Sequence, residues 1–217
     1  MELGLNEPVI VENGSGIYLT LDTDITFSGY DQVNLHGRRA IVLGELYDKI
    51  LSSLEESGKA FYPGLLYYAS LPVEEITKIT GLSTESAGKA KERDFSETLF
   101  NADLRSTAYQ NLEKALKSQG LQPTPGSKYV TITSNRSDKG KAVKLVIDAY
   151  TKEFGKVVSY GIGDSFNDLA MLKTVDLPYL VQKPDKSWAD IHLDKLSKGA
   201  AIGPAGWNVM AREVLAR

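Results

Sequence analysis

A glycine- and aspartate-rich segment at residues 161–169, Gly-Ile-Gly-Asp-Ser-Phe-Asn-Asp-Leu, lies between an apolar run at 156–160 and a helical pattern. This order predicts a buried strand that turns into a helix, a junction at which parallel sheets bind ligands. The two glycines let a backbone approach closely, and Asp164 and Asp168 are spaced so that both can face one side. Helix capping explains one or two of these polar residues, but not the glycines and both aspartates together.

Around this segment, helical and strand-like patterns alternate with short connections, which predicts an α/β fold with a parallel sheet. The middle of the chain, 21–136, is less regular and is typical of an α+β module. We therefore predict a core made of residues 1–20 and 137–217, with the module 21–136 inserted into it. The predicted strands are 9–11, 17–21, 40–43, 129–133, 156–160 and 179–181. The predicted helices are 47–56, 73–80, 84–92, 103–119, 138–154, with Phe154 facing inward, and one that begins at 164–173. The predicted loops are 31–39 and 123–126.

Composition narrows the chemistry that such a core can carry. The 217 residues include no cysteine and two histidines, so thiol chemistry and histidine-rich zinc sites are excluded or disfavoured. Carboxylates without imidazole or thiolate neighbours suit Mg²⁺. The net charge of −3 gives no sign of a nucleic-acid or membrane-surface partner, and no apolar run approaches the ~20 residues that span a bilayer. We expect a cytoplasmic protein.

Two further segments follow or open predicted elements. Lys139 falls in the first turn of a predicted helix, where the helix dipole disfavours a lysine but favours a bound phosphate. An ordinary solvated lysine beside the capping residue Asp138 explains it equally well. Glu12, Asn13 and Gly14 follow the strand at 9–11, and taken alone they predict only a turn.

Taken in order, these segments resemble the haloacid dehalogenase-like phosphatases with a large inserted cap, and within them the mannosyl-3-phosphoglycerate phosphatase family. The resemblance implies a Rossmann-like parallel core, incomplete at its N-terminus, and an α+β cap. It also implies a Mg²⁺-dependent phosphomonoester hydrolase that releases phosphate from a glycosyl-3-phosphoglycerate in compatible-solute synthesis. The matching stretches are 4–14, 91–98, 138–140, 163–168 and 203–207.

The resemblance also implies roles for individual residues. Asp164 corresponds to the Mg²⁺ ligand, Asp168 and Asn167 to its supports, and Lys139 to the lysine that pairs with the nucleophile and the phosphoryl group. On the cap, Arg93 would meet the glycerate carboxylate, for which its planar fork is suited, and Glu97 the sugar hydroxyls; alternatively, these two form a pair on a solvated helix face. The remaining substrate-binding residues are Glu12, Asn13, Gly14 and Ser165.

The family's first motif, Asp-x-Asp-x-Thr, supplies the nucleophile and the general acid, and it precedes the strand at 9–11. The one literal match here is Asp22-Thr23-Asp24-Ile25-Thr26, which follows that strand and is therefore disfavoured as the nucleophile. We expect either that the working protein has residues upstream, or that the chain is a non-catalytic sugar-phosphate-binding remnant. A sheet without its first strand would expose an apolar seam and favour self-association.

Overall fold

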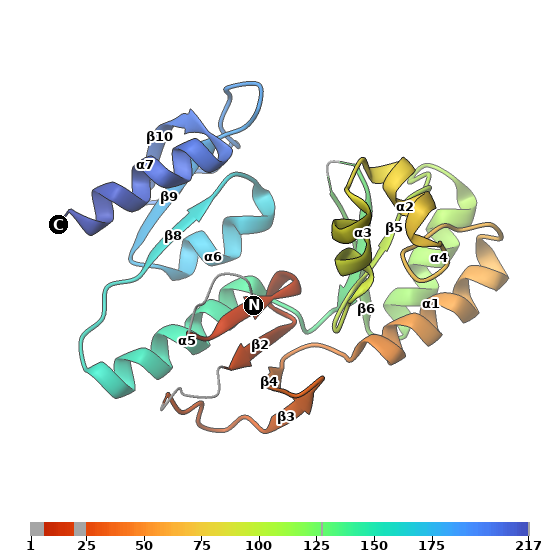
Figure 1. Cartoon of the computed structure of the whole chain (residues 1–217), viewed down its shortest axis with the longest axis horizontal. Helices are drawn as coiled ribbons and strands as arrows, with labels where there is room; N and C mark the ends of the chain where they lie inside the picture. Colours follow the sequence, from red (N-terminus) through yellow and green to blue (C-terminus); the bar gives the residue numbers. More distant parts are fainter. Residues whose placement is uncertain (1–6, 20–24, 127, 217) are drawn as a thin grey trace. The chain divides into compact units, whose positions relative to one another are not determined.

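The computed structural model describes residues 7–19, 25–126 and 128–216 of the chain. The chain divides into two compact units, the first formed by residues up to 41 together with those from 138 onward, and the second by Val42–Ser137. Figure 1 shows the elements of both. None of the helices in the described ranges is long and apolar enough to cross a membrane. Asp22 and Asp24 lie outside the described residues.

Residues 7–19, 25–41 and 138–216 of the first unit form two sheets. One has the strand order β1-β2-β4-β3 and the other is parallel, with the order β10-β9-β8. Helices flank the parallel sheet, and its strands alternate with them along the chain (Figure 1), which confirms the predicted α/β class. The strands are β1 (Val9–Val11), β2 (Gly16–Leu19), β3 (Gln32–Leu35), β4 (Arg38–Val42), β8 (Tyr160–Gly163), β9 (Leu177–Gln182) and β10 (Ser197–Ile202); the helices are α5 (Lys139–Phe154), α6 (Leu169–Thr174) and α7 (Gly203–Leu215).

The predicted loop at 31–39 is wrong, because this segment forms a β-hairpin from β3 and β4. Asn34 pairs with Arg39 across the hairpin, and the turn residues His36 and Gly37 have φ angles of 50° and 77°. Positive φ at both central residues is typical of the tight turns that join twisted strands. Because β4 neighbours β2, the described residues 25–41 group with the first unit, whereas the predicted core segment ended at residue 20.

Helix α5 begins where the sequence predicts. The Asp138 side chain caps it by accepting a hydrogen bond from the Lys141 backbone N–H at 3.0 Å. The inward position predicted for Phe154 is wrong, since 64% of this residue is exposed, and Ala142 and Ala149 are the buried apolar residues of the helix.

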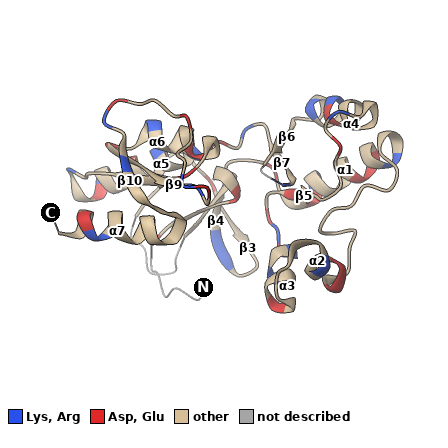
Figure 2. Ribbon diagram, turned by 90° about the horizontal axis from the view of Figure 1, so that it is seen from above, with Lys and Arg blue, Asp and Glu red and all other residues tan. Residues whose placement is uncertain are grey.

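The described residues of the second unit form an antiparallel sheet, β5-β7-β6, and four helices. The helix Val73–Thr80 is confirmed residue for residue, whereas the predicted loop at 123–126 is wrong because both prolines lie in β6, an outer strand, where a missing N–H is tolerated. The exposed helices carry charges of both signs (Figure 2), with ion pairs such as Lys117–Glu113 at 2.8 Å. The elements are α1 (Tyr47–Phe61), α2 (Val73–Thr80), α3 (Thr84–Lys91), β5 (Glu97–Leu99), α4 (Thr107–Ser118), β6 (Leu121–Pro125) and β7 (Val130–Ser134).

Tyr109 leads to a prediction about the stability of this unit. Its side chain lies in the core formed by α1, α4 and the sheet, and its buried hydroxyl has no hydrogen-bond partner among the described residues. Burial raises its pKa to about 12. We expect Tyr109→Phe to raise the free energy of unfolding by about 1 kcal/mol, because it removes an unsatisfied hydroxyl and keeps the ring.

Thermal and urea denaturation would measure this change. The matched control is Tyr62→Phe, because the Tyr62 hydroxyl donates to the Asn101 carbonyl at 2.8 Å and accepts from the Asp103 N–H at 3.2 Å. We expect this control to lose about 1 kcal/mol. A Tyr109→Phe variant that melts below the wild type would contradict the prediction.

Candidate active site

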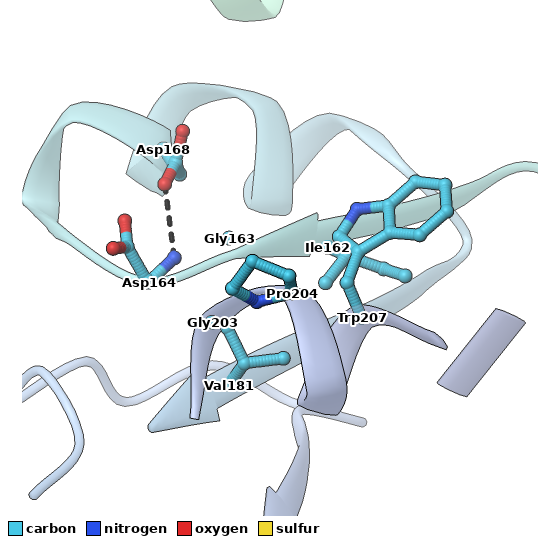
Figure 3. A pocket seen from close by; sticks show the side chains of 8 residues that line it. All are labelled: Ile162, Gly163, Asp164, Asp168, Val181, Gly203, Pro204 and Trp207. Carbon is cyan, nitrogen blue, oxygen red and sulfur yellow. Dashed lines mark hydrogen bonds between the residues drawn. The ribbon is translucent and has the colours of Figure 1, made fainter. Parts of the chain in front are cut away.

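The first unit has a cavity of about 450 Å³ beside the end of β8. One side of it comes from the ends of β8 and β9 and the other from the start of α7 (Figure 3). Its polar groups are two carboxylates, and most of the other lining side chains are apolar. The lining residues are Ile162, Gly163, Asp164, Asp168, Val181, Gly203, Pro204 and Trp207.

Asp168 forms hydrogen bonds to two segments that are far apart in the sequence, the start of α5 and the turn after β8. Its Oδ1 accepts a hydrogen bond from the Lys139 ammonium at 2.7 Å, and its Oδ2 accepts from the backbone N–H groups of Asp164 at 3.0 Å and Ser165 at 3.4 Å. The Lys139 side chain is only 24% exposed, so its description as an ordinary solvated lysine is wrong. The carboxylate of Asp168 therefore fixes the lysine of α5 against the turn that follows β8.

The close fit of this turn depends on Gly163. A Cβ atom at this position would lie 2.5 Å from the Cβ of Asp168, which is shorter than any tolerated contact. The glycine therefore lets the Asp168 side chain cross the strand end and reach the backbone beyond it.

The ionisation of Asp168 follows from these contacts. Burial raises its pKa, but the hydrogen bonds from Lys139 and the two backbone N–H groups outweigh burial, so the pKa lies below its ordinary value of 3.8. Because the pKa is lower in the folded than in the unfolded chain, the ionised group stabilises the fold above pH 3.8, and this contribution is lost as the pH falls through the folded-state pKa. Carbon-13 NMR titration of the carboxyl would measure this, and a value above 3.8 would contradict it.

Asp164 is the free carboxylate of the cavity. It is exposed, and Figure 3 shows that the hydrogen bond to Asp168 comes from the Asp164 backbone nitrogen and does not involve the Asp164 carboxylate. Its carboxylate is the kind of ligand that Mg²⁺ prefers, but the described residues contain no group of three or more Asp, Glu, His or Cys side chains that could hold a metal ion. These residues therefore fit a cation that takes one carboxylate from the described part and its other ligands from water and a phosphorylated substrate, as Mg²⁺ commonly does.

The Glu12–Gly14 segment lies against the start of α5. Glu12, Asn13 and Gly14 all have positive φ angles, of 46°, 59° and 85°. A Cβ on Gly14 would lie 2.5 Å from the backbone carbonyl of Asp138, so only glycine allows this contact. The structure thus brings the turn after β1 next to the first residue of α5, Lys139. Asn167 is exposed, and no hydrogen bond to its side chain occurs in the described part of the chain.

Arg93 and Glu97 lie in the second unit, and neither is on a helix, because α3 ends at Lys91 and β5 begins at Glu97. The alternative that they pair on a solvated helix face is therefore wrong. The Arg93 guanidinium lies 4.8 Å from the centre of the Tyr68 ring and donates to the Ala90 carbonyl at 2.8 Å. Their roles in substrate binding stay predictions.

Glu97 is fully buried and accepts hydrogen bonds from four donors. Its partners are the Tyr47 hydroxyl at 2.8 Å and the backbone N–H groups of Tyr68 at 3.2 Å, Ala69 at 3.1 Å and Thr98 at 2.5 Å. Burial, together with the negative charge of Glu97, raises the pKa of Tyr47.

Trp207 and Pro204 line the cavity, but sequence reasoning did not assign them a role. Both belong to the Gly-Pro-Ala-Gly-Trp stretch at 203–207, which served only as a marker of resemblance. The sequence signal for a role in the cavity would have been a tryptophan at the start of a helix that directly follows a strand.

The first unit combines a parallel sheet flanked by helices with a lysine and two carboxylates at the end of one strand, and it is formed by two chain segments on either side of the unit Val42–Ser137. These features together define a class of hydrolase. The chain belongs to the haloacid dehalogenase-like hydrolases, whose family profile matches residues 1–188. Within this class, the chain is 35% identical over 208 residues to a glucosyl-3-phosphoglycerate/mannosyl-3-phosphoglycerate phosphatase of Methanococcoides burtonii, covering 95% of the chain and 75% of that protein.

A mannosyl-3-phosphoglycerate phosphatase of Pyrococcus horikoshii is 36% identical over 185 residues, which is 83% of the chain and 70% of the relative. Solved structures show the same fold at lower identity. A protein of Streptococcus mutans aligns with a TM-score of 0.56 at 19% identity, over 97% of the chain and 77% of its own length. A haloalkanoate-superfamily phosphatase of Bacteroides thetaiotaomicron aligns with a TM-score of 0.53 at 14% identity, over 95% and 73%.

Proposed function

We propose that the protein is a Mg²⁺-dependent phosphatase that hydrolyses a glycosyl-3-phosphoglycerate, with mannose or glucose as the sugar, in the cytoplasm. The observation that carries the proposal is the contact between Lys139 and Asp168 at 2.7 Å, beside the free carboxylate of Asp164. The names of the relatives from Methanococcoides and Pyrococcus supply the substrate.

Each of these groups has a physical task in such a reaction. The Lys139 ammonium, held in place by Asp168, neutralises negative charge on the phosphoryl group as it is transferred. Asp164 would hold Mg²⁺, which supplies charge neutralisation and orientation of the phosphate oxygens. In the cap, Arg93 would bind the glycerate carboxylate. A contact between Glu97 and the sugar hydroxyls would compete with the four hydrogen bonds that this carboxylate already accepts.

Phosphate release from mannosyl- and glucosyl-3-phosphoglycerate, measured with and without Mg²⁺, tests the proposal. We expect Asp164→Asn to reduce Mg²⁺-dependent release by about 10²-fold or more, since it removes a charged group that the transition state needs. The matched control is Asp190→Asn, whose side chain is 88% exposed and does not line the cavity.

The same measurements distinguish a phosphatase from a non-catalytic sugar-phosphate-binding protein. Binding of the ligand without phosphate release would identify a non-catalytic sugar-phosphate-binding protein, which the single free carboxylate of the described cavity favours. Loss of release in Asp22→Asn, together with unchanged ligand affinity, would assign the nucleophile to the Asp-x-Asp-x-Thr match at 22–26. Absence of both binding and release would refute the proposal.

A further inference from the structure

The wall of the cavity opposite Asp164 carries an exposed aromatic side chain. Trp207 lies in the second turn of α7, and 56% of its surface is exposed. Figure 3 shows the indole beside Ile162, with Pro204 between it and Asp164. No hydrogen bond to the indole N–H occurs in the part of the chain that the structure describes.

The second tryptophan of the chain provides a contrast. Trp188 packs against the cluster that contains Leu172 and Leu180, and its indole N–H donates to the Gly199 carbonyl at 3.1 Å. It does not line the cavity. One tryptophan is therefore part of the core, whereas the other presents its ring to the cavity.

The backbone under Trp207 is fixed by close packing. A Cβ on Gly206 would lie 2.3 Å from the Ala201 carbonyl oxygen, so the start of α7 is pressed against the end of β10. Met210, one turn later, is buried against Tyr179 and Val181 of β9. The helix cannot rotate the Trp207 backbone away from the cavity without breaking these contacts, so the residue is placed at the cavity in advance of any ligand.

The cavity has two chemically different sides. Asp164 and the Asp168–Lys139 pair form a charged end, and the side chains of Ile162, Val181 and Trp207 form an apolar wall. A ligand that fits both must carry a phosphorylated end and a body with an apolar face. The face of an aromatic ring is negative and attracts the weakly positive C–H groups on one face of a pyranose. A phosphoglycerate without a sugar has no pyranose ring and therefore offers no C–H face for stacking.

We propose that Trp207 is a specificity-determining residue that stacks on the sugar ring of a glycosylated phosphomonoester. This inference rests on the proposed function, because it takes the phosphorylated end of the ligand to lie at Asp164 and Lys139.

Ligand binding tests the inference without turnover. The probes are glucosyl-3-phosphoglycerate and 3-phosphoglycerate, titrated calorimetrically in a buffer without divalent cations. We expect Trp207→Ala to weaken the binding of the glycosylated probe by about 5- to 10-fold and to change the affinity for 3-phosphoglycerate less than about 2-fold. Trp207→Phe should retain most of the affinity, and Trp188→Phe should leave both affinities unchanged.

Fluorescence gives an independent readout, because each of these phenylalanine variants leaves one tryptophan. We expect the glycosylated probe to change the emission of Trp188→Phe, in which Trp207 remains, and not that of Trp207→Phe. Equal weakening of both probes by Trp207→Ala, or no weakening, would overturn the inference and leave the proposed function standing. Failure of the wild type to bind either probe, both in this buffer and with Mg²⁺ present, would refute the proposed function, and the inference with it.

Discussion

Lys139→Met is expected to reduce phosphate release by about 10²- to 10³-fold, the range seen when one preorganised donor to a developing negative charge is removed. Methionine keeps the length and apolar stem of lysine but places no charge at the end of β8. The Lys139 side chain is part-buried and ion-paired at 2.7 Å, so solvent screens its charge less than that of a surface lysine. Steady-state release with saturating Mg²⁺ would measure the effect on kcat.

The matched control is Lys141→Met, because Lys141 lies two residues further along α5 and is exposed. We expect the control to keep full activity.

The same variants also test the effect of Lys139 on the pKa of Asp168. Without Lys139, the pKa of Asp168 should rise relative to wild type, because burial remains and its strongest favourable contact is lost. Lys139→Met with more than about a tenth of wild-type activity would contradict the assigned role.

Local patterns predicted the parts of the site that depend on local backbone structure. Asp138 was identified as a cap because it precedes an amphipathic stretch, and α5 begins immediately after it. The strand-to-helix turn falls within 161–169 as expected, with Asp164 directly after β8. The predicted strand at 156–160 is wrong except for Tyr160, because β8 is Tyr160–Gly163 and contains both glycines. Capping chemistry and strand-to-helix turns depend on neighbouring residues, so one sequence is enough to predict them.

Contacts between distant segments were beyond such patterns. The residues that form β3 and the turn at His36 and Gly37 show no apolar alternation, and the hairpin is defined by the pairing of β3 with β4. The prolines of β6 indicate a loop unless the strand is known to be an outer one. Phe154 matches the helical period, but 64% of it is exposed, and its ring contact is with Tyr150 of the same helix at 5.7 Å between ring centres. In each case the structure depends on which distant segment packs alongside. Local periodicity in the sequence carries no information about that segment.

Glu97 is the clearest example of this limit, because nothing in its neighbourhood in the sequence indicates a buried charge. The carboxylate holds together three parts of the second unit: the start of α1 through the Tyr47 hydroxyl, the 68–69 backbone, and β5 itself. Because all four partners are donors, an acceptor-only carboxylate satisfies them and an amide cannot.

We therefore expect Glu97→Ala to lower the free energy of unfolding of the second unit by about 3–5 kcal/mol, because it leaves these buried donors without an acceptor. Glu97→Gln should lie between the alanine variant and the wild type, since its NH₂ group would face another donor. Hydrogen exchange at the Thr131 and Ile132 amides of β7, the strand that pairs with β5, would measure the change in this unit alone.

The matched control is Glu113→Ala, which removes an ion pair between partly exposed side chains on α4 and should cost no more than about 1 kcal/mol. Exchange rates also distinguish the two roles considered for Glu97. If Glu97→Ala leaves exchange in β7 unchanged and abolishes turnover, the carboxylate acts on the substrate and the structural explanation is wrong. If exchange accelerates in β7 while the first unit keeps wild-type protection, the buried hydrogen bonds stabilise the second unit, and loss of activity follows from loss of its structure.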